Sequence, residues 1–257
     1  MKIQYVNPAG NVTAIVEGFV PMAERISLSK KILDKKCAEQ VGFETAPALG
    51  GLYRLEMMGG EFCGNAARSF GYLKALEAYG GGVHTVNVEV SGAEVPVPVL
   101  VDLDKSTAFA QMPVPTRLEV VEVKGTAYPV VMCHGICHLI ALGMQPDAEF
   151  VKEALEVMEG LKQDAYGIMF LDARKGTLTP AVYVPTTDSL IWESSCGSGS
   201  VACGWYLSQD TAIVDDCDVS GYTFKQPGGT IQVEIVLKDG KANSCTMGGE
   251  ISIINNV

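Results

Sequence analysis

Apolar residues along this chain follow two patterns, one typical of strands and one of helices. Short runs rich in β-branched residues, with partial alternation of apolar and polar positions, indicate half-buried strands. Longer stretches carry apolar residues three or four positions apart, which is the spacing of one helix face. The predicted strands are Ala14–Val20, Thr85–Val90, Val97–Val101, Tyr128–Met132, His138–Leu142, Ile168–Leu171, Ala181–Val184 and Ile231–Leu237, and the predicted helices are Met22–Ala38, Ala66–Tyr79, Ala148–Leu161 and Ser200–Ser208.

Glycines mark two of the predicted helices. The helix Ala66–Tyr79 is followed by three consecutive glycines at 80–82, a strong termination signal. The helix Ser200–Ser208 contains Gly204, and a glycine inside a helix costs about 1 kcal/mol relative to alanine. A close packing contact would account for this glycine.

A cysteine on a glycine-rich turn occurs twice, each time just before a predicted helix. The two segments are Gly60–Ala67, with Cys63, and Ser194–Val201, with Cys196. A helix start presents unpaired backbone N–H groups and a partial positive charge, so it binds carboxylates and lowers the pKa of a thiol. Two such turns facing each other would hold an α-carboxylate between two thiols, one on each face of the α-carbon, which is the geometry of a cofactor-independent racemase.

The repeated turn also indicates an internal duplication into two α+β lobes, although coincidence is an alternative for so short a repeat. The boundary falls near the Met-Pro-Val-Pro segment at 112–115. We assign residues 1–115 to an N-terminal lobe with the first cysteine and residues 116–249 to a C-terminal lobe with the second. A final strand near 250–257 is left open, with a return to the N-terminal lobe as one alternative.

Composition narrows the classes of partner. The chain has 257 residues, of which 47% are hydrophobic, and 30 acidic residues outnumber 19 basic ones for a formal charge of −11. Nucleic acid and anionic membranes are not expected partners, because both need clustered Lys and Arg. Neither a secretory apolar core nor a membrane-length apolar run is visible, so we expect a cytoplasmic protein. Its eight cysteines are then expected to be reduced, with Cys37 and Cys203 as core residues.

The motifs around the two cysteines resemble those of the diaminopimelate epimerase family. Cys63–Arg68 (Cys-Gly-Asn-Ala-Ala-Arg) is similar to the family's first catalytic motif, Cys-Gly-Asn-Gly-x-Arg, and Cys196–Ser200 to its second, Cys-Gly-Thr/Ser-Gly-Ala. Near the start of the chain, Gly10-Asn11 resembles the family's Gly-Asn, and weaker similarities lie between and after the two motifs at His138, Gln226–Gly229 and Thr246–Gly249. The resemblance implies an α+β fold of two pseudo-symmetric lobes, each a mixed β-sheet around a central helix, with the active site between the lobes.

The resemblance also implies a role for each matching residue. Cys63 and Cys196 would be the acid/base pair, because inversion of an α-carbon removes a proton on one face and delivers one on the other. The remaining matching residues would bind or support the substrate: Gly64, Asn65, Gly197, Ser198 and Asn11 at its carboxylate, and His138 as a positioning residue beneath the site. Glu193 does not match the spacing of the family's glutamate, but its place three residues before Cys196 suits it to accept the substrate ammonium or a basic side chain. The alternatives are structural turns or a disulfide for the two cysteines, an Asx turn for Asn11 and a solvated loop carboxylate for Glu193.

Departures from the family pattern point to a changed substrate. The positions of the family's distal asparagines hold Met57, Ile136 and Gly167, and the segment 186–191 lacks the family's arginine. A distal carboxylate would be desolvated and unpaired there, at a cost of several kcal/mol. We therefore expect a racemase or epimerase without pyridoxal phosphate (PLP) or any other cofactor, acting on histidine or a similar amino acid rather than on diaminopimelate. Histidine racemases exist in the wider family, and Glu193 suits a cationic or imidazole side chain.

Other functions remain as alternatives. The second cysteine motif partly resembles that of proline and hydroxyproline racemases, so a racemase of that kind or another isomerase on the same fold is one of them. A non-catalytic amino-acid-binding relative is another, although a binder needs neither thiol. The run Cys133–His138 suggests a metal site, but alternation along a strand would put its cysteines and histidines on opposite faces, so no metal is expected. A homodimer is an assembly that the family resemblance allows.

Overall fold

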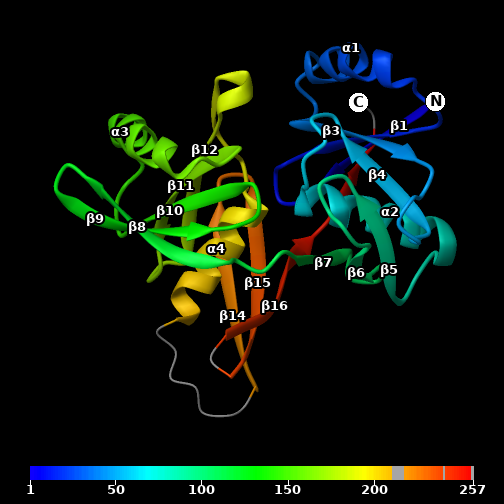
Figure 1. The fold of residues 1–257 in the computed structure, drawn as a ribbon. Coiled ribbons are helices and arrows are strands. Elements are labelled where there is room, and N and C mark those ends of the chain that lie inside the picture. Colours follow the sequence, from blue (N-terminus) through cyan, green and yellow to red (C-terminus); the bar gives the residue numbers. More distant parts are fainter. Residues whose placement is uncertain (210–216, 240, 256–257) are drawn as a thin grey trace. The chain divides into compact units, whose positions relative to one another are not determined.

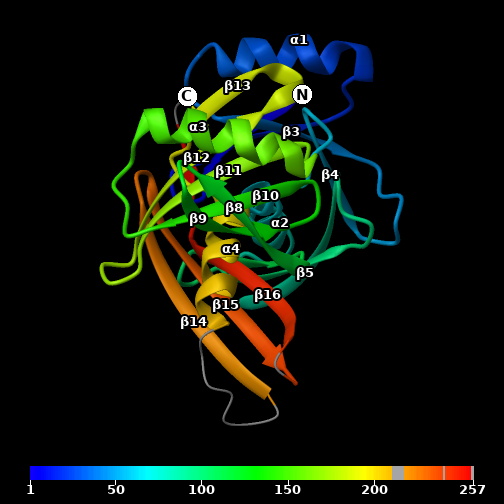
Figure 2. The same ribbon diagram turned by 60° about the vertical axis from the view of Figure 1, so that its left-hand side comes forward.

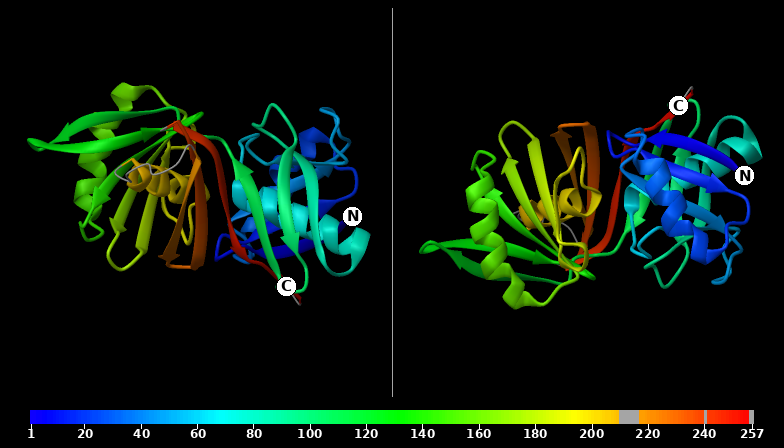
Figure 3. Two further views of the ribbon diagram at one scale, coloured as in Figure 1. Left: turned by 90° about the horizontal axis from the view of Figure 1, so that it is seen from below. Right: turned by 90° about the horizontal axis from the view of Figure 1, so that it is seen from above.

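The structure, a computed structural model, describes residues 1–209, 217–239 and 241–255. The chain forms two compact units (Figures 1 and 2). Unit 1 consists of Met1–Gln111 together with Met247–Val257, and unit 2 of Met112–Thr246. Strands dominate both units, as the two opposite views of Figure 3 show, and the chain is a mixed α+β protein.

Unit 1 combines parallel and antiparallel strand pairs with two helices. The pairs β2–β3 and β4–β5 are parallel, whereas β1–β2, β3–β4, β5–β6, β6–β7 and β1–β17 are antiparallel. Its elements are β1 (Lys2–Asn7), β2 (Thr13–Glu17), α1 (Met22–Leu33), β3 (Gln40–Thr45), β4 (Tyr53–Met57), α2 (Gly64–Tyr79), β5 (Val83–Val90), β6 (Val97–Asp102), β7 (Thr107–Met112) and β17 (Ser252–Ile254).

Helix α2 lies in the core of unit 1. Its residues are buried without interruption from Gly64 to Ala75, and it packs against β2, β4, β5 and β6 (Figure 1). The helix ends at Gly80, whose φ of 73° is left-handed and whose N–H bonds to the Leu76 carbonyl. Glycine adopts that conformation at little cost, which explains why the helix stops there.

Unit 2 has the same kind of organisation, with helix α4 as its buried helix. Helix α4 packs mainly against β14 and β15 and also touches β9, β10 and β11 (Figure 2). The elements are β8 (Arg117–Val123), β9 (Thr126–Met132), β10 (Ile136–Leu142), α3 (Ala148–Met158), η1 (Glu159–Leu161), β11 (Ala165–Asp172), β12 (Thr177–Val184), η2 (Pro185–Thr187), β13 (Ser189–Trp192), α4 (Gly197–Ser208), β14 (Cys217–Gln226) and β15 (Gly229–Lys238). Strand β16 (Lys241–Glu250) begins in unit 2 and ends in unit 1.

All the predicted helices and strands have counterparts, but several boundaries differ. The helix predicted over Met22–Ala38 ends at Leu33, because the chain turns there and Lys36 takes a left-handed φ of 57°. The helix predicted over Ala148–Leu161 ends as α3 at Met158 and continues as one 3₁₀ turn. A close contact accounts for Gly204 inside its helix, because a Cβ there would lie 3.0 Å from Val233 Cγ1. None of the helices in the described ranges combines the length and apolar character that crossing a membrane requires.

Candidate active site

Cys63 is the N-cap residue of helix α2. Its backbone is extended, with φ −133° and ψ 113°, and its Sγ accepts a hydrogen bond from the Ala66 N–H at 3.4 Å. The half-buried thiol therefore lies where the first N–H groups of α2 have no partner within the helix. Gly64 and Asn65 follow as the first two buried residues of the helix. The helix start that the motif predicted is therefore present, and binding of an anion there stays a prediction.

Arg68, on the same helix, has no exposed surface and ties this turn to the end of unit 1. Its Nε donates to Asn65 Oδ1 at 3.2 Å, and its Nη1 donates to the carbonyls of Gly249 and Glu250 at 3.2 and 3.3 Å. Burial lowers the pKa of Arg68 to about 9, and the negative charge of an ionised Cys63 would act in the opposite direction. Arg68 thus holds the Asn65 amide in place and sets a positive charge near the first thiol.

Asn11 lies in unit 1 on the loop between β1 and β2. Its Nδ2 donates to Glu39 Oε2 at 3.1 Å, and its Oδ1 accepts from Gln40 Nε2 at 2.6 Å. The side-chain turn at Gly10 is made by Asn7, whose Oδ1 accepts from the Gly10 N–H at 2.6 Å. The Asx-turn alternative for Asn11 therefore does not describe this loop, and its contact with a substrate carboxylate stays a prediction.

Cys196 caps helix α4 as Cys63 caps α2. Its φ is −120° and its ψ 114°, and its Sγ accepts from the Gly199 N–H at 3.4 Å. Unlike Cys63, it is buried, and its N–H donates to Gln226 Oε1 at 2.9 Å. The Gln226 amide also donates to Ser200 Oγ at 2.8 Å, so one side chain from β14 braces the whole turn.

The surroundings of Cys196 disfavour its thiolate. Burial raises the pKa of Cys196 well above its ordinary value, and the Glu193 carboxylate raises it further by its charge and by a hydrogen bond with the thiol. Hydrogen bonds from Ser198 and Gly199 act in the opposite direction. Glu193 follows β13 directly, and its N–H donates to the Pro180 carbonyl at 3.0 Å.

His138, on β10, reaches the second thiol through Ser198. Its Nε2 lies 3.1 Å from Ser198 Oγ, which in turn lies 3.6 Å from Cys196 Sγ. The imidazole is completely buried, its Nδ1 has no hydrogen-bond partner, and burial lowers its pKa to about 3, so the ring is neutral. The ring fits because Gly167 faces it: a Cβ at that position would overlap Nδ1.

The chain does not run as one strand through Cys133–His138, which the argument against a metal site had assumed. Strand β10 begins only at Ile136, and the chain reverses just before it, with the Cys133 N–H bonded to the Ile136 carbonyl at 2.9 Å and Gly135 at φ 74°. The turn removes the geometric argument made against a metal site. Across the described residues, however, no group of three or more His, Cys, Asp or Glu side chains is arranged to hold a metal ion.

The structure thus brings most of the predicted residues together in two groups, one in each unit, while Asn11 contacts Glu39 and Gln40 instead. Cys63, Gly64 and Asn65 share the start of α2, whereas His138, Glu193 and the Cys196–Ser198 turn meet at the start of α4. Arg68 and Gln226 belong to these groups as well. They occurred in matching motifs, but their contacts join segments far apart in the chain and were not predicted.

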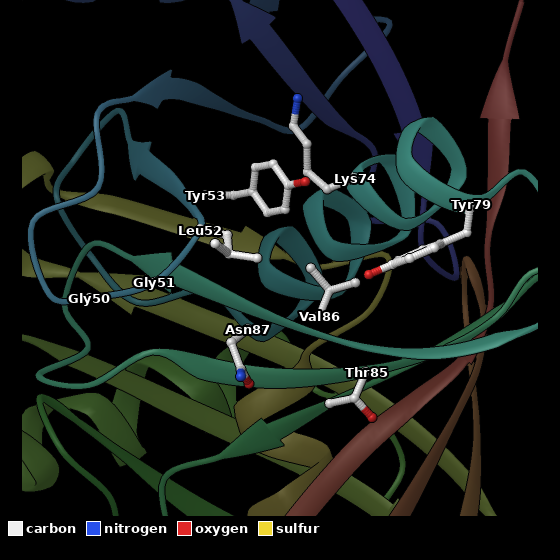
Figure 4. Close-up of a pocket in the computed structure, with 9 residues that line it drawn as sticks. All are labelled: Gly50, Gly51, Leu52, Tyr53, Lys74, Tyr79, Thr85, Val86 and Asn87. Carbon is white, nitrogen blue, oxygen red and sulfur yellow. The ribbon is translucent and has the colours of Figure 1, made fainter.

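A pocket elsewhere in unit 1 contains no predicted site residue (Figure 4). It is lined by Gly50, Gly51, Leu52, Tyr53, Lys74, Tyr79, Thr85, Val86 and Asn87. The Lys74 ammonium is already paired with Glu44 and Glu77 at 2.9 and 3.0 Å. The pocket therefore offers no unpaired cation to an anionic ligand.

Comparisons with known proteins identify the family of this chain. A family model described as the histidine racemase CntK N-terminal domain matches residues 2–256. A histidine racemase from Fusobacterium nucleatum is 33% identical over 217 residues, which cover 79% of this chain and 80% of the relative. A histidine racemase from Staphylococcus aureus is 31% identical over 240 residues, covering 88% of this chain and 85% of the relative.

Solved structures share the fold at much lower identity. A probable proline racemase from Agrobacterium radiobacter K84 has a TM-score of 0.66 and 12% identity, covering 100% of this chain and 93% of the other. A hydroxyproline epimerase from Agrobacterium vitis has the same TM-score and identity, with coverage of 98% and 90%. The family match spans nearly the whole sequence, and both curated relatives are racemases. The chain is therefore an isomerase, a PLP-independent amino-acid racemase, and it belongs to the family of the histidine racemase CntK N-terminal domain.

Proposed function

We propose that this protein racemises histidine with two thiols, Cys63 and Cys196, which act on opposite faces of one α-carbon. One observation carries the proposal: the two cysteines occupy equivalent N-cap positions, each with extended backbone and each accepting a helix N–H at 3.4 Å. A structural turn needs no thiol at that place. Equivalent positions on two separate helices suit two groups that exchange the roles of acid and base between the two directions of the reaction.

The fold proposal follows from the same equivalence. We infer that the two units are the pseudo-symmetric lobes predicted over residues 1–115 and 116–249, with slightly different bounds, that each has a mixed sheet around a central helix, and that each supplies one thiol. The burial of α2 from Gly64 to Ala75 and the largely buried α4 support a central helix in each. The active site lies between the lobes in this proposal.

The reaction needs no redox step. One cysteine, as thiolate, takes the α-proton and becomes a thiol, and the electron pair left on the α-carbon is delocalised into the carboxylate. The other cysteine, as thiol, donates its proton to the opposite face and becomes a thiolate. The exchange leaves the enzyme with the two protonation states reversed and the substrate inverted.

Backbone N–H groups at the two helix starts are proposed to hold the substrate carboxylate. The donors belong to Gly64 and Asn65 on α2 and to Gly197 and Ser198 on α4, with Asn11 as a further contact. Negative charge builds on the carboxylate as the α-proton leaves, and helix N-termini stabilise that charge. Losing one such donor typically slows a reaction by about 100- to 1000-fold.

Histidine is the proposed substrate because the relatives that cover most of the chain are histidine racemases. Glu193, beside the second thiol, is a suitable acceptor for the substrate ammonium or imidazole. The similarity to a probable proline racemase is one of fold, at 12% identity, and does not indicate which substrate this chain binds. Diaminopimelate is disfavoured by Gly167, since His138 occupies the space that a side chain there would need.

The test is proton NMR of the enzyme in D₂O with L-histidine, D-histidine and L-proline in separate samples. We expect the α-proton signal of both histidine enantiomers to disappear and that of proline to persist. Cys63→Ala and Cys196→Ala should each abolish racemisation. Cys37→Ala is the control, since Cys37 is half-buried, belongs to neither cysteine turn, and its Sγ donates to the Lys35 carbonyl at 3.2 Å. Exchange with proline instead of histidine, or activity surviving either alanine variant, would overturn the proposal.

A further inference from the structure

We propose that the two thiols differ in the resting enzyme: the buried Arg68 guanidinium holds Cys63 as the thiolate, and the Glu193 carboxylate holds Cys196 as the thiol. The inference rests on the proposed two-thiol function and adds to it an order of events. The free enzyme is ready to remove a proton at the Cys63 face and to donate one at the Cys196 face.

Arg68 is a buried cation, and no carboxylate among the described residues pairs with it. Its three hydrogen bonds go to the Asn65 amide oxygen and to two backbone carbonyls, and its Nη2 has no partner. In the described part of the chain, no ion pair joins Arg68 to an acidic side chain. Burying such a charge without a counterion is costly, so a nearby anion is strongly favoured.

Cys63, the N-cap of the same helix, is the group whose ionised form would supply this negative charge. Its attraction is what favours the protonated form of Arg68 against the effect of burial. Interaction between two charges is mutual, so Arg68 favours the Cys63 thiolate to the same extent. The start of α2 adds to this effect, because the Ala66 N–H already donates to Sγ.

The second thiol has the opposite surroundings. The charged side chain that contacts Cys196 is the Glu193 carboxylate, and repulsion between two anions disfavours the thiolate. His138, which reaches it through Ser198, is neutral and brings no compensating positive charge. The Gln226 amide, from β14, is uncharged and is occupied by the Cys196 N–H and by Ser200.

Because of this asymmetry, the resting enzyme has the protonation states needed to react with one enantiomer and not with the other. The enantiomer whose α-hydrogen faces Cys63 meets the protonation states that it needs. Its proton goes to the Cys63 thiolate, the Cys196 proton goes to the α-carbon, and the product leaves an enzyme with Cys63 as thiol and Cys196 as thiolate. The resting state returns when solvent protonates Cys196 and removes the proton from Cys63.

The first experiment measures the alkylation rate of each cysteine by iodoacetamide as a function of pH, using mass spectrometry of the peptides. Midpoints of the two profiles are compared rather than rates, because Cys196 is more buried than Cys63. We expect the Cys63 midpoint to lie below that of Cys196. Arg68→Met should slow Cys63 alkylation near neutral pH by about tenfold or more, which is the effect of a one-unit displacement of its midpoint, and should leave the Cys196 profile in place.

Two further variants keep the proposal falsifiable if Arg68→Met does not fold. Arg68→Lys retains the positive charge and should keep the Cys63 midpoint near that of the wild type. Glu193→Gln removes the negative charge and should lower the Cys196 midpoint only. Equal midpoints in the wild type, or a Cys63 profile that is the same with and without a cation at position 68, would overturn the inference.

The same enzyme sample separates this inference from the proposed function. If the α-proton of histidine exchanges in D₂O while the two cysteine midpoints coincide, the racemase function holds and the assignment of resting states is wrong. If the midpoints differ as expected but no histidine exchange occurs, the histidine proposal fails while the electrostatic asymmetry stands.

Discussion

A residue without a side chain, Gly167, decides where the imidazole of His138 lies. The ring is fully buried, and a Cβ on Gly167 would overlap its Nδ1. The position is also one of those where the resembling family has an asparagine. An asparagine at position 167 would therefore be incompatible with the buried position of His138 next to Ser198.

Gly167→Ala is expected to displace His138 and to lower the free energy of unfolding by about 1–3 kcal/mol, the usual cost of overpacking. Racemisation should fall as well, because Ser198 loses its partner. Urea unfolding and the α-proton exchange rate measure the two effects. Gly221→Ala is the control, since a Cβ at Gly221 has no neighbour within 4 Å; equal effects at both positions would contradict the packing argument.

Glu89 is a buried carboxylate that organises the loop before β4. It accepts hydrogen bonds from the N–H groups of Ala48, Leu49 and Gly51 at 2.7, 2.6 and 2.9 Å and from Arg54 at 3.1 Å. Burial acts to raise the pKa of Glu89, but these hydrogen bonds outweigh it and lower the pKa to about 2. The ionised carboxylate is thus the form on which this loop depends.

The lowered pKa predicts a pH-dependent stability. A carboxyl whose pKa is lower in the folded state than its ordinary 4.5 stabilises the fold fully above that value. The contribution decreases as the pH falls from about 5 towards 2. Glu89→Gln should therefore cost most near neutral pH, and its difference from the wild type should shrink on acidification. Chemical unfolding at a series of pH values measures this; a pH-independent difference would refute the assignment.

At the scale of elements, the patterned segments could be predicted and the others could not. The strands with β-branched runs and the four longer helices have counterparts close to their predicted places. Strands such as β4 and β13 are short, and β16 carries polar residues and paired glycines, so neither length nor alternation marks them. Helix α2 shows the opposite problem: it is buried through polar residues, including Arg68 and Lys74, so an apolar stripe does not describe its buried surface.

The site divides in the same way. The two cysteine turns are local motifs, and each was found as such, with the helix that follows it. The contacts of Arg68 with Gly249 and Glu250, and of Gln226 with Cys196, join different elements. No local pattern encodes a partner so far along the chain, and such contacts emerge only from the fold.

Packing of α4 on β15 limits what position 204 accepts. A Cβ on Gly204 would lie 3.0 Å from Val233 Cγ1 and 3.2 Å from the Tyr222 ring. Val233 is β-branched and fixed in a strand, so it yields little. Gly204→Ala gains helix propensity but is expected to lower the free energy of unfolding by about 1 kcal/mol on balance.

Thermal and urea unfolding of Gly204→Ala measure this effect. Gly160→Ala, on the 3₁₀ turn after α3, is the matched control, because a Cβ there has no neighbour within 4 Å. A Gly204→Ala variant more stable than the wild type would show that β15 moves to accommodate the methyl group.

At the scale of the whole molecule, both proposed catalytic thiols belong to one chain. Each of the two units has its own buried core, with Phe70 among the residues at the centre of unit 1 and Phe170 among those of unit 2. Mixing Cys63→Ala protein with Cys196→Ala protein should leave the solution inactive, since every chain then lacks one thiol. The α-proton exchange of histidine measures this. Recovery of activity on mixing would mean that two copies share a site.

The return of the chain to unit 1 at Met247 has a consequence for synthesis. Ile251 belongs to the core of unit 1, β17 pairs with β1, and the carbonyls of Gly249 and Glu250 receive Arg68. A ribosome adds these residues after all of unit 2, so unit 2 is complete while unit 1 still lacks part of its core. We expect unit 2 of the nascent chain to fold before unit 1 is complete. Cys63 then becomes a reactive thiolate only after Arg68 has reached its carbonyl partners. The unfinished protein therefore does not expose this nucleophile to oxidants and electrophiles.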